Sequence, residues 1–179
     1  MVYVFLADGF EIIEALSPVD MLRRAGIEVK TVGVTGQVVQ ASCGVKVTAD
    51  VMPEEVSIES AQAVVIPGGL PGVTNLEESE FVKDCVLKAA DSGKFVCAIC
   101  AGPSLIGKLG LLKGKNAISY PGFEQYLEGA EISSEYVVRD GNFITARGAG
   151  VSVDFGLEIV AALNGKEASD KVRKTIQCR

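Results

Sequence analysis

Apolar runs and amphipathic stretches alternate along the chain. Three runs of consecutive apolar residues predict short strands buried on both faces. These runs are residues 2–6, 63–66 and 95–99. Three longer stretches place apolar residues at helical spacing and predict amphipathic helices. These stretches are residues 11–24, 78–92 and 151–163. Strands that alternate with helices imply an α/β fold with right-handed crossovers and a mostly parallel sheet covered on both faces.

Glycine, proline and shorter patterns divide the rest of the chain. Gly26 predicts the end of the first helix, and Pro18 inside that helix predicts a kink or a delayed start. Residues 27–34 alternate between apolar and polar and predict a second strand, and residues 116–119 predict another short one.

Two hairpins complete the pattern. Residues 36–51 are rich in Gly, Val and Thr, and residues 136–146 cross an Asp-Gly-Asn turn. The tail after Gly165 is mixed and charged. No repeat, linker or low-complexity segment interrupts the chain, so we expect one domain over residues 1–179.

The pentapeptide Ala-Ile-Cys-Ala-Gly at residues 98–102 stands out chemically. Where a strand turns sharply into a helix, the corner residue lies in a tight bend and its neighbours must be small. This pentapeptide is the cysteine version of that nucleophile elbow, and Pro103 suits the first turn of the helix that follows. We predict that Cys100 is a nucleophile at a helix N-terminus, which would lower the pKa of its thiol. The alternative is a cysteine that only packs in the core.

Charge and cysteine content narrow the function classes. The formal net charge of -6 argues against nucleic-acid binding, and no run is long enough to span a membrane. Five cysteines, an odd number, argue against a disulfide framework and for a reducing compartment, which we expect to be the cytoplasm. The N-terminus shows no signal-peptide pattern.

The chain contains no histidine, and this absence limits its chemistry. A Cys-His-Asp triad cannot form, even in a homo-oligomer. A zinc site is not expected, because Cys97 and Cys100 have no second pair, and Cys97 falls within the predicted strand as a core residue.

Other candidate residues follow the ends of predicted strands, where ligands bind in α/β sheets. Gly68 and Gly69 place unhindered N–H groups there and could bind an oxyanion, although most Gly-Gly pairs are ordinary turns. Glu11 and Glu14 begin the first helix, either as solvated residues of its first turn or as a carboxyl beside the thiol. The local sequence does not choose between the two glutamates.

Four motifs resemble the ThiJ/PfpI superfamily over nearly the whole chain. They are ADGFEIIEALSPVDMLRRAGIEV, VVIPGGLPGVTNL, AICAGPSLIGKLGLLKGK and ARGAGVSVDFGLEIVAALNG. The resemblance implies a flavodoxin-like three-layer α/β sandwich with a mostly parallel central sheet and a cysteine nucleophile elbow. It also implies a homodimer.

The resemblance assigns roles to individual residues. Cys100 matches the family's oxidation-prone nucleophile, and Glu14 matches the carboxyl that hydrogen-bonds it. Glu11 matches a second acid near the mouth of the pocket, and Arg147 a basic residue after the hairpin.

The oxyanion site and one departure complete the carried-over set. Gly69 with Gly68 matches the oxyanion loop, aided by the N–H of Ala101. Tyr120 stands where many members carry a pocket histidine. A phenol with a pKa near 10 is a poor base at neutral pH, so peptidase activity is not expected.

We therefore predict a cofactor-independent, cysteine-dependent protein that acts on small 2-oxoaldehydes or glycated adducts, as glyoxalases and deglycases do. One alternative is an oxidation-sensing stress protein in which Cys100 becomes a sulfinate. Another is a module that binds a small ligand, for which the sequence offers no phosphate-loop signature. The expected partners are an aldehyde substrate and a second copy of the chain.

Overall fold

Six strands form the central sheet of this computed structural model, which describes residues 1–178. The strand order is β2-β1-β5-β6-β10-β9, and only β9 runs antiparallel to its neighbour. The strands are β1 (Val2–Leu6), β2 (Val29–Gly33), β5 (Ala63–Ile66), β6 (Phe95–Ile99), β9 (Val137–Asp140) and β10 (Phe143–Ala146). The carboxyl ends of β1, β5 and β6 meet at one edge of the sheet, the edge where parallel α/β folds bind ligands.

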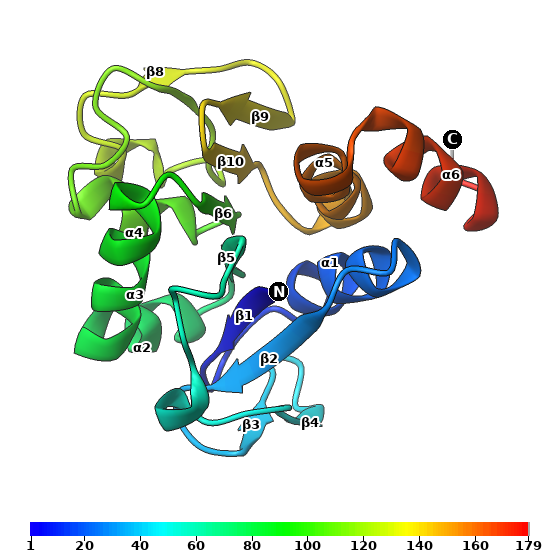
Figure 1. The fold of residues 1–179 in the computed structure, drawn as a ribbon. Helices are drawn as coiled ribbons and strands as arrows, with labels where there is room; N and C mark the ends of the chain where they lie inside the picture. The colour runs from blue at the N-terminus through cyan, green and yellow to red at the C-terminus, as the bar shows by residue number, and fades with distance from the viewer. Residues whose placement is uncertain (179) are drawn as a thin grey trace.

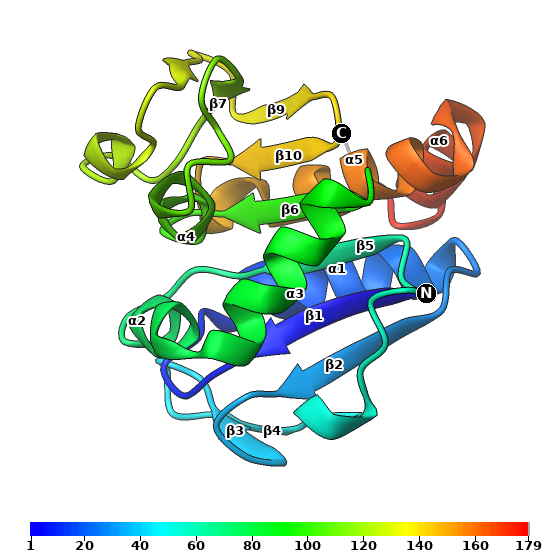
Figure 2. The same ribbon diagram turned by 60° about the vertical axis from the view of Figure 1, so that its left-hand side comes forward.

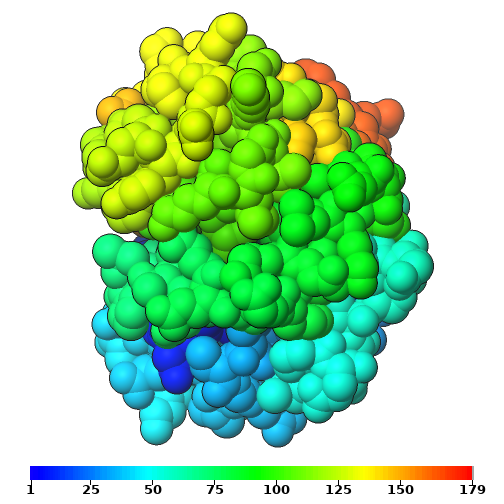
Figure 3. Space-filling view, turned by 90° about the vertical axis from the view of Figure 1, so that its left-hand side faces the viewer, coloured from blue at the N-terminus to red at the C-terminus, as the bar shows by residue number. Residues whose placement is uncertain are grey.

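Helices cover both faces of this sheet and make three layers (Figures 1 and 2). The first face carries α1 (Ile12–Arg24) and α5 (Ser152–Asn164), with α6 (Lys166–Thr175) packed on α5. The second face carries α2 (Gly72–Glu78), α3 (Glu80–Asp91) and α4 (Pro103–Lys108). Figure 3 shows the second face, where green residues of the middle of the chain hide most of the blue N-terminal segment. The expected three-layer α/β sandwich is confirmed.

Two apolar cores lie between these layers, one on each face of the sheet. Because successive strand residues point to opposite faces, β1 contributes to both cores. Val2, Val4 and Leu6 join the core under α1 and α5, whereas Tyr3 and Phe5 join the core under α2, α3 and α4. Within residues 1–178, the helices are too short or too polar for any of them to span a bilayer.

Most of the predicted elements occur, with bounds adjusted by capping. The strands at residues 2–6, 63–66 and 95–99 are present as predicted. The two expected hairpins are β3 (Val38–Gln40) with β4 (Lys46–Thr48), and β9 with β10.

Proline and serine set the course of two helices. Helix α1 continues through Pro18, which lies buried within it. The backbone of Pro18 closely approaches Gly156 of α5. The helix expected over residues 78–92 is present as α3 but begins at Glu80, because Ser79 accepts a hydrogen bond from the N–H of Val82 and is the N-cap of α3.

Two α-helices and one strand of the described residues were not predicted. Helix α2 precedes Ser79, and α6 occupies most of the tail whose last residue, 179, lies outside the described part. A short strand, β8 (Glu131–Ile132), pairs with β7 (Asn116–Ala117), which is the strand expected near residues 116–119.

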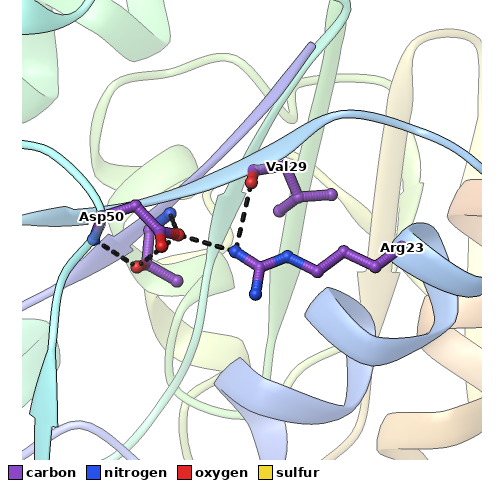
Figure 4. Close-up of polar contacts among 4 residues, drawn as sticks. Arg23, Val29 and Asp50 are labelled. Atoms are coloured by element: carbon purple, nitrogen blue, oxygen red, sulfur yellow. Dashed lines mark hydrogen bonds and ion pairs between the residues drawn. The ribbon is translucent and has the colours of Figure 1, made fainter.

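Asp50 protects the free edge of the sheet at β2 (Figure 4). Its Oδ2 accepts hydrogen bonds from the backbone N–H and the hydroxyl of Thr31, at 2.9 and 3.0 Å, and from Arg23 at 2.7 Å. The backbone of Val51 bonds to the same edge. These contacts occupy donors and acceptors of β2 that could otherwise pair with another chain.

We expect Asp50→Asn to lower the free energy of unfolding by about 1 kcal/mol at neutral pH, a charged hydrogen-bond network discounted for solvent exposure. Hydrogen bonds from Thr31 and the charge of Arg23 outweigh desolvation and lower the pKa of Asp50. The stabilisation is therefore present above the unfolded pKa of about 3.9 and is lost as the pH falls through the lower folded pKa. Urea unfolding at several pH values measures this.

Asp20→Asn is the matched control, because Asp20 makes only an exposed ion pair with Arg24 one turn along α1. We expect its effect to stay below about 0.5 kcal/mol. Equal effects of the two substitutions would show that the contacts of Asp50 to β2 add nothing.

Candidate active site

Cys100 lies at the corner between β6 and α4 in a strained backbone conformation. Its φ of 64° is in the left-handed region, which non-glycine residues rarely adopt. Two backbone hydrogen bonds hold this corner: the Cys100 N–H donates to the carbonyl of Ala146 at 2.9 Å, and the Cys100 carbonyl accepts from the N–H of Tyr120 at 2.8 Å. The structure therefore forms the predicted elbow.

The neighbouring strand end must be glycine for the site to close. A Cβ at Gly68 would lie 2.4 Å from Glu14 Oε2, 2.7 Å from Cys100 Cβ and 3.1 Å from the Cys100 sulfur. No side chain fits in this space, so Gly68 allows the carboxyl and the thiol to meet over its backbone.

Glu14 reaches the thiol from the first turn of α1. It is 1% exposed, hydrogen-bonds Cys100, and accepts a hydrogen bond from the Gly68 N–H at 2.9 Å. Burial raises the pKa of Glu14 to about 7, with a contribution from the charge of Glu11, against hydrogen bonds that favour the carboxylate. A pKa near neutrality is what a general acid or base requires.

The expected low pKa of the Cys100 thiol is wrong for this structure. Burial, followed by the charge and hydrogen bond of Glu14, raises the pKa of Cys100 to about 12. The backbone N–H groups of Ala101 and Gly69 act in the opposite direction but do not compensate. The helix contributes little, because it has six residues and begins only at Pro103.

Glu11 has a different position from Glu14, which settles the choice that the local sequence left open. Glu11 is the N-cap of α1, and its Oε2 accepts a hydrogen bond from the Glu14 N–H at 2.8 Å. It stabilises the start of the helix and acts on the thiol only through its charge on Glu14.

Two backbone N–H groups face the sulfur, those of Gly69 and Ala101. Gly69 has a φ of 91°, and its loop packs closely on the backbone of residues 9–11. The Gly68 N–H is occupied by Glu14. Of the three residues expected to bind an oxyanion, Gly69 and Ala101 are therefore placed to do so, whereas Gly68 positions the acid.

A pocket of about 450 Å³ adjoins this group. Tyr120, Pro121, Tyr136 and residues 147–151 line it, whereas Cys100 does not. Tyr120 and Arg147, both expected at the site, lie on this wall rather than at the sulfur. Tyr120 is 51% exposed, and its backbone N–H donates to the Cys100 carbonyl, which connects the wall to Cys100.

Sequence reasoning missed two contributors to the site. The Ala149 N–H donates a hydrogen bond to the Glu14 carboxyl, and Tyr136, which is 60% exposed, lines the pocket. The run Gly-Ala-Gly at residues 148–150 was the available signal for the first, because small residues between a strand and a helix permit close approach.

Two of the other cysteines, Cys85 and Cys97, are buried core residues. Cys97 is fully buried in β6, as predicted, and burial raises its pKa well above the usual range. Burial also raises the pKa of Cys85, to about 11. All five cysteines are free thiols.

Comparisons with known proteins identify relatives of the whole chain. The model of the DJ-1/PfpI family matches residues 1–162. Protein dj-1beta of Drosophila melanogaster is 37% identical over 174 residues, which are 96% of this chain and 93% of that protein. The solved structure of oxidized DJ-1 from Toxoplasma gondii has a TM-score of 0.94 and 32% identity, with 99% of this chain and 97% of that one covered.

A further relative carries a functional name. The glutathione-independent glyoxalase DJR-1.2 of Caenorhabditis elegans is 29% identical over 167 residues, which are 93% of this chain and 89% of that protein. Family model, relatives and structural neighbours agree, and the chain belongs to the DJ-1/PfpI family.

Proposed function

We propose that this protein is a cofactor-independent enzyme that uses Cys100 to convert small 2-oxoaldehydes, or the adducts they form, in the manner of a glyoxalase or deglycase. One observation carries the proposal: a buried carboxyl with a pKa of about 7 hydrogen-bonds a strained cysteine that two backbone N–H groups face. The relative named as a glyoxalase supports the same reading.

The reactive form of the pair arises by an internal proton transfer. The carboxylate of Glu14 raises the pKa of the thiol, but a protonated Glu14 would donate a hydrogen bond to a thiolate instead. When the thiol proton moves to Glu14, the thiolate has a neutral hydrogen-bond donor beside it instead of a negatively charged carboxylate. The pair loses one proton in total and holds the thiolate as a minor form.

The reaction then follows from the positions of these groups. The thiolate attacks the aldehyde carbon, and the aldehyde oxygen becomes an oxyanion that the N–H groups of Gly69 and Ala101 can stabilise. This oxyanion takes up a proton to give a hemithioacetal. Glu14 removes the proton from that carbon, the adjacent carbonyl oxygen takes up a proton, and an enediol forms. Glu14 then returns a proton to the adjacent carbon while the hydroxyl on the sulfur-bearing carbon loses its proton, which leaves a 2-hydroxy thioester. Water hydrolyses the resulting thioester and regenerates the thiol. Methylglyoxal plus water gives lactic acid.

Oxidation sensing is the second candidate function. The same N–H groups and the protonated carboxyl would hold the oxygens of a cysteine sulfinate formed with hydrogen peroxide. The neighbouring structure from Toxoplasma gondii is described as oxidized, which favours retaining this candidate.

We also propose a homodimer in the cytoplasm. Five free thiols support a reducing compartment. Strand β1 lies between β2 and β5 and is buried, so it cannot form the dimer interface. Helix α1 remains available, because its Ile13 is 51% exposed.

Methylglyoxal turnover tests the enzyme proposal. We expect Cys100→Ser to abolish lactate formation, a loss on the order of 10³-fold or more. Glu14→Gln should lower kcat by about 100-fold, the usual contribution of a general acid–base. Cys43→Ser, at an exposed cysteine, serves as the control. Turnover that survives Cys100→Ser would refute the proposal. Peroxide oxidation of Cys100 without turnover would favour the sensor.

Alkylation by iodoacetamide tests the shared proton. In the wild type we expect the Cys100 rate to rise with an inflection near pH 7, because loss of one proton from the pair creates the thiolate form. Glu14→Gln and Glu14→Leu should both lose this inflection, since neither variant has a carboxylate at residue 14 to accept the thiol proton. Cys43, mapped in the same samples, is the internal control. An unchanged inflection in both variants would show that Glu14 does not govern the thiol.

Light scattering tests the dimer. We expect twice the chain mass at micromolar concentration. Ile13→Asp should shift the protein toward monomer, because a dimer formed through α1 would bury the new carboxylate without a partner. Leu87→Asp is the matched control, since Leu87 is an exposed apolar residue of α3 on the opposite face. A monomeric wild type would contradict the dimer, and an Ile13→Asp dimer would exclude this face.

A further inference from the structure

The pocket beside Cys100 is much larger than methylglyoxal requires. Its volume is about 450 Å³, within the range of about 300–1,000 Å³ that is usual for small-molecule sites. A three-carbon substrate would leave most of this space empty. The volume of the pocket therefore suits a larger substrate, which carries a further group beyond its two reacting carbonyls.

Arg147 supplies an uncompensated positive charge in this pocket. It is the one cationic residue of the lining, which contains no carboxylate. Within residues 1–178 no carboxylate lies within 4.0 Å of its guanidinium. Arg139, on the same hairpin, is by contrast paired with Glu158 at 3.9 Å.

Tyr136 holds the guanidinium of Arg147 in place. The guanidinium carbon of Arg147 lies 5.4 Å from the centre of the Tyr136 ring. The backbone N–H of Arg147 donates a hydrogen bond to the backbone carbonyl of Tyr136 at 2.9 Å. A guanidinium held over an aromatic ring can still donate its N–H groups to a planar anion such as a carboxylate.

The charged wall is close to the reacting sulfur. Arg147 directly follows Ala146, whose carbonyl accepts the Cys100 N–H at 2.9 Å, and consecutive Cα atoms are about 3.8 Å apart. Tyr120, on the same wall, is bonded to the Cys100 carbonyl. A substrate held at both places would carry its anion a few bonds from its aldehyde.

We propose that Arg147 selects 2-oxoaldehydes that carry a carboxylate at the end remote from the aldehyde, with Tyr136 as the positioning residue for the guanidinium. This inference rests on the proposed function and names its substrate class. The carboxylate binds the free N–H edge of Arg147, the chain occupies the apolar part of the pocket, and the aldehyde reaches Cys100.

The kinetic test compares 4,5-dioxopentanoate with its methyl ester, which has the same reacting group and lacks the charge. Water and 4,5-dioxopentanoate give 2-hydroxyglutarate by the same proton shift. We expect kcat/KM to favour the acid by about 10- to 100-fold in the wild type, the size of a charge-assisted hydrogen bond. The preference should fall to near 1 in Arg147→Met and return in part in Arg147→Lys, which keeps the charge but not the planar fork.

Arg139→Met is the matched control, because Arg139 also lies over an aromatic ring, Phe95 at 5.1 Å, but outside the pocket. It should keep the wild-type preference. A wild-type preference near 1, or one that survives Arg147→Met, would overturn the inference.

A binding measurement separates this inference from the proposed function. Levulinate has the carboxylate and the ketone but no aldehyde, so calorimetry follows it without turnover. We expect it to bind the wild type at least about 10-fold more tightly than Arg147→Met, and more tightly than methyl levulinate. This result would support the inference even if no 2-oxoaldehyde were turned over. Equal binding to wild type and Arg147→Met, or none to the wild type, would overturn it.

Discussion

The buried contact between Glu14 and Cys100 is the interaction on which the rest of the site depends. A carboxyl that is 1% exposed is costly to ionise, and this cost raises its pKa to about 7. The thiol beside it has a raised pKa for the same reason. Neither group is activated alone. Reactivity arises from the pair, because the carboxylate of Glu14 can accept the thiol proton and then donate a hydrogen bond to the thiolate.

The sheet order makes this contact possible. Glu14 follows β1, Gly68 follows β5 and Cys100 follows β6, and these three strands are neighbours with their carboxyl ends at one edge. The contact also requires an empty volume over Gly68, where any Cβ would collide with both reacting groups. Topology brings the segments together, and the missing side chain allows the final approach.

The sequence predicted much of the fold because β1, β5, β6 and α1 carry strong apolar patterns. It missed α2, which lacks a helical apolar repeat, and α6, whose ten residues are mostly polar and bury only Ser169 and Val172. The elbow was readable from small residues around Cys100, and resemblance selected Glu14. The direction of the thiol pKa was not readable, because burial and the distance to Glu14 exist only in the folded chain. Tyr136 was missed because the predicted hairpin was followed only to residue 146, although its register places Tyr136 opposite Arg147.

The backbone of Cys100 is bonded on either side to other backbone atoms, the Ala146 carbonyl and the Tyr120 N–H. Such contacts do not depend on which side chains those segments carry. The side chains of residues 120 and 147 can therefore change through evolution while the nucleophile keeps its conformation. In this arrangement substrate range and catalytic geometry are inherited separately. A family built on it can diversify the molecules it recognises without having to reinvent its reactive cysteine.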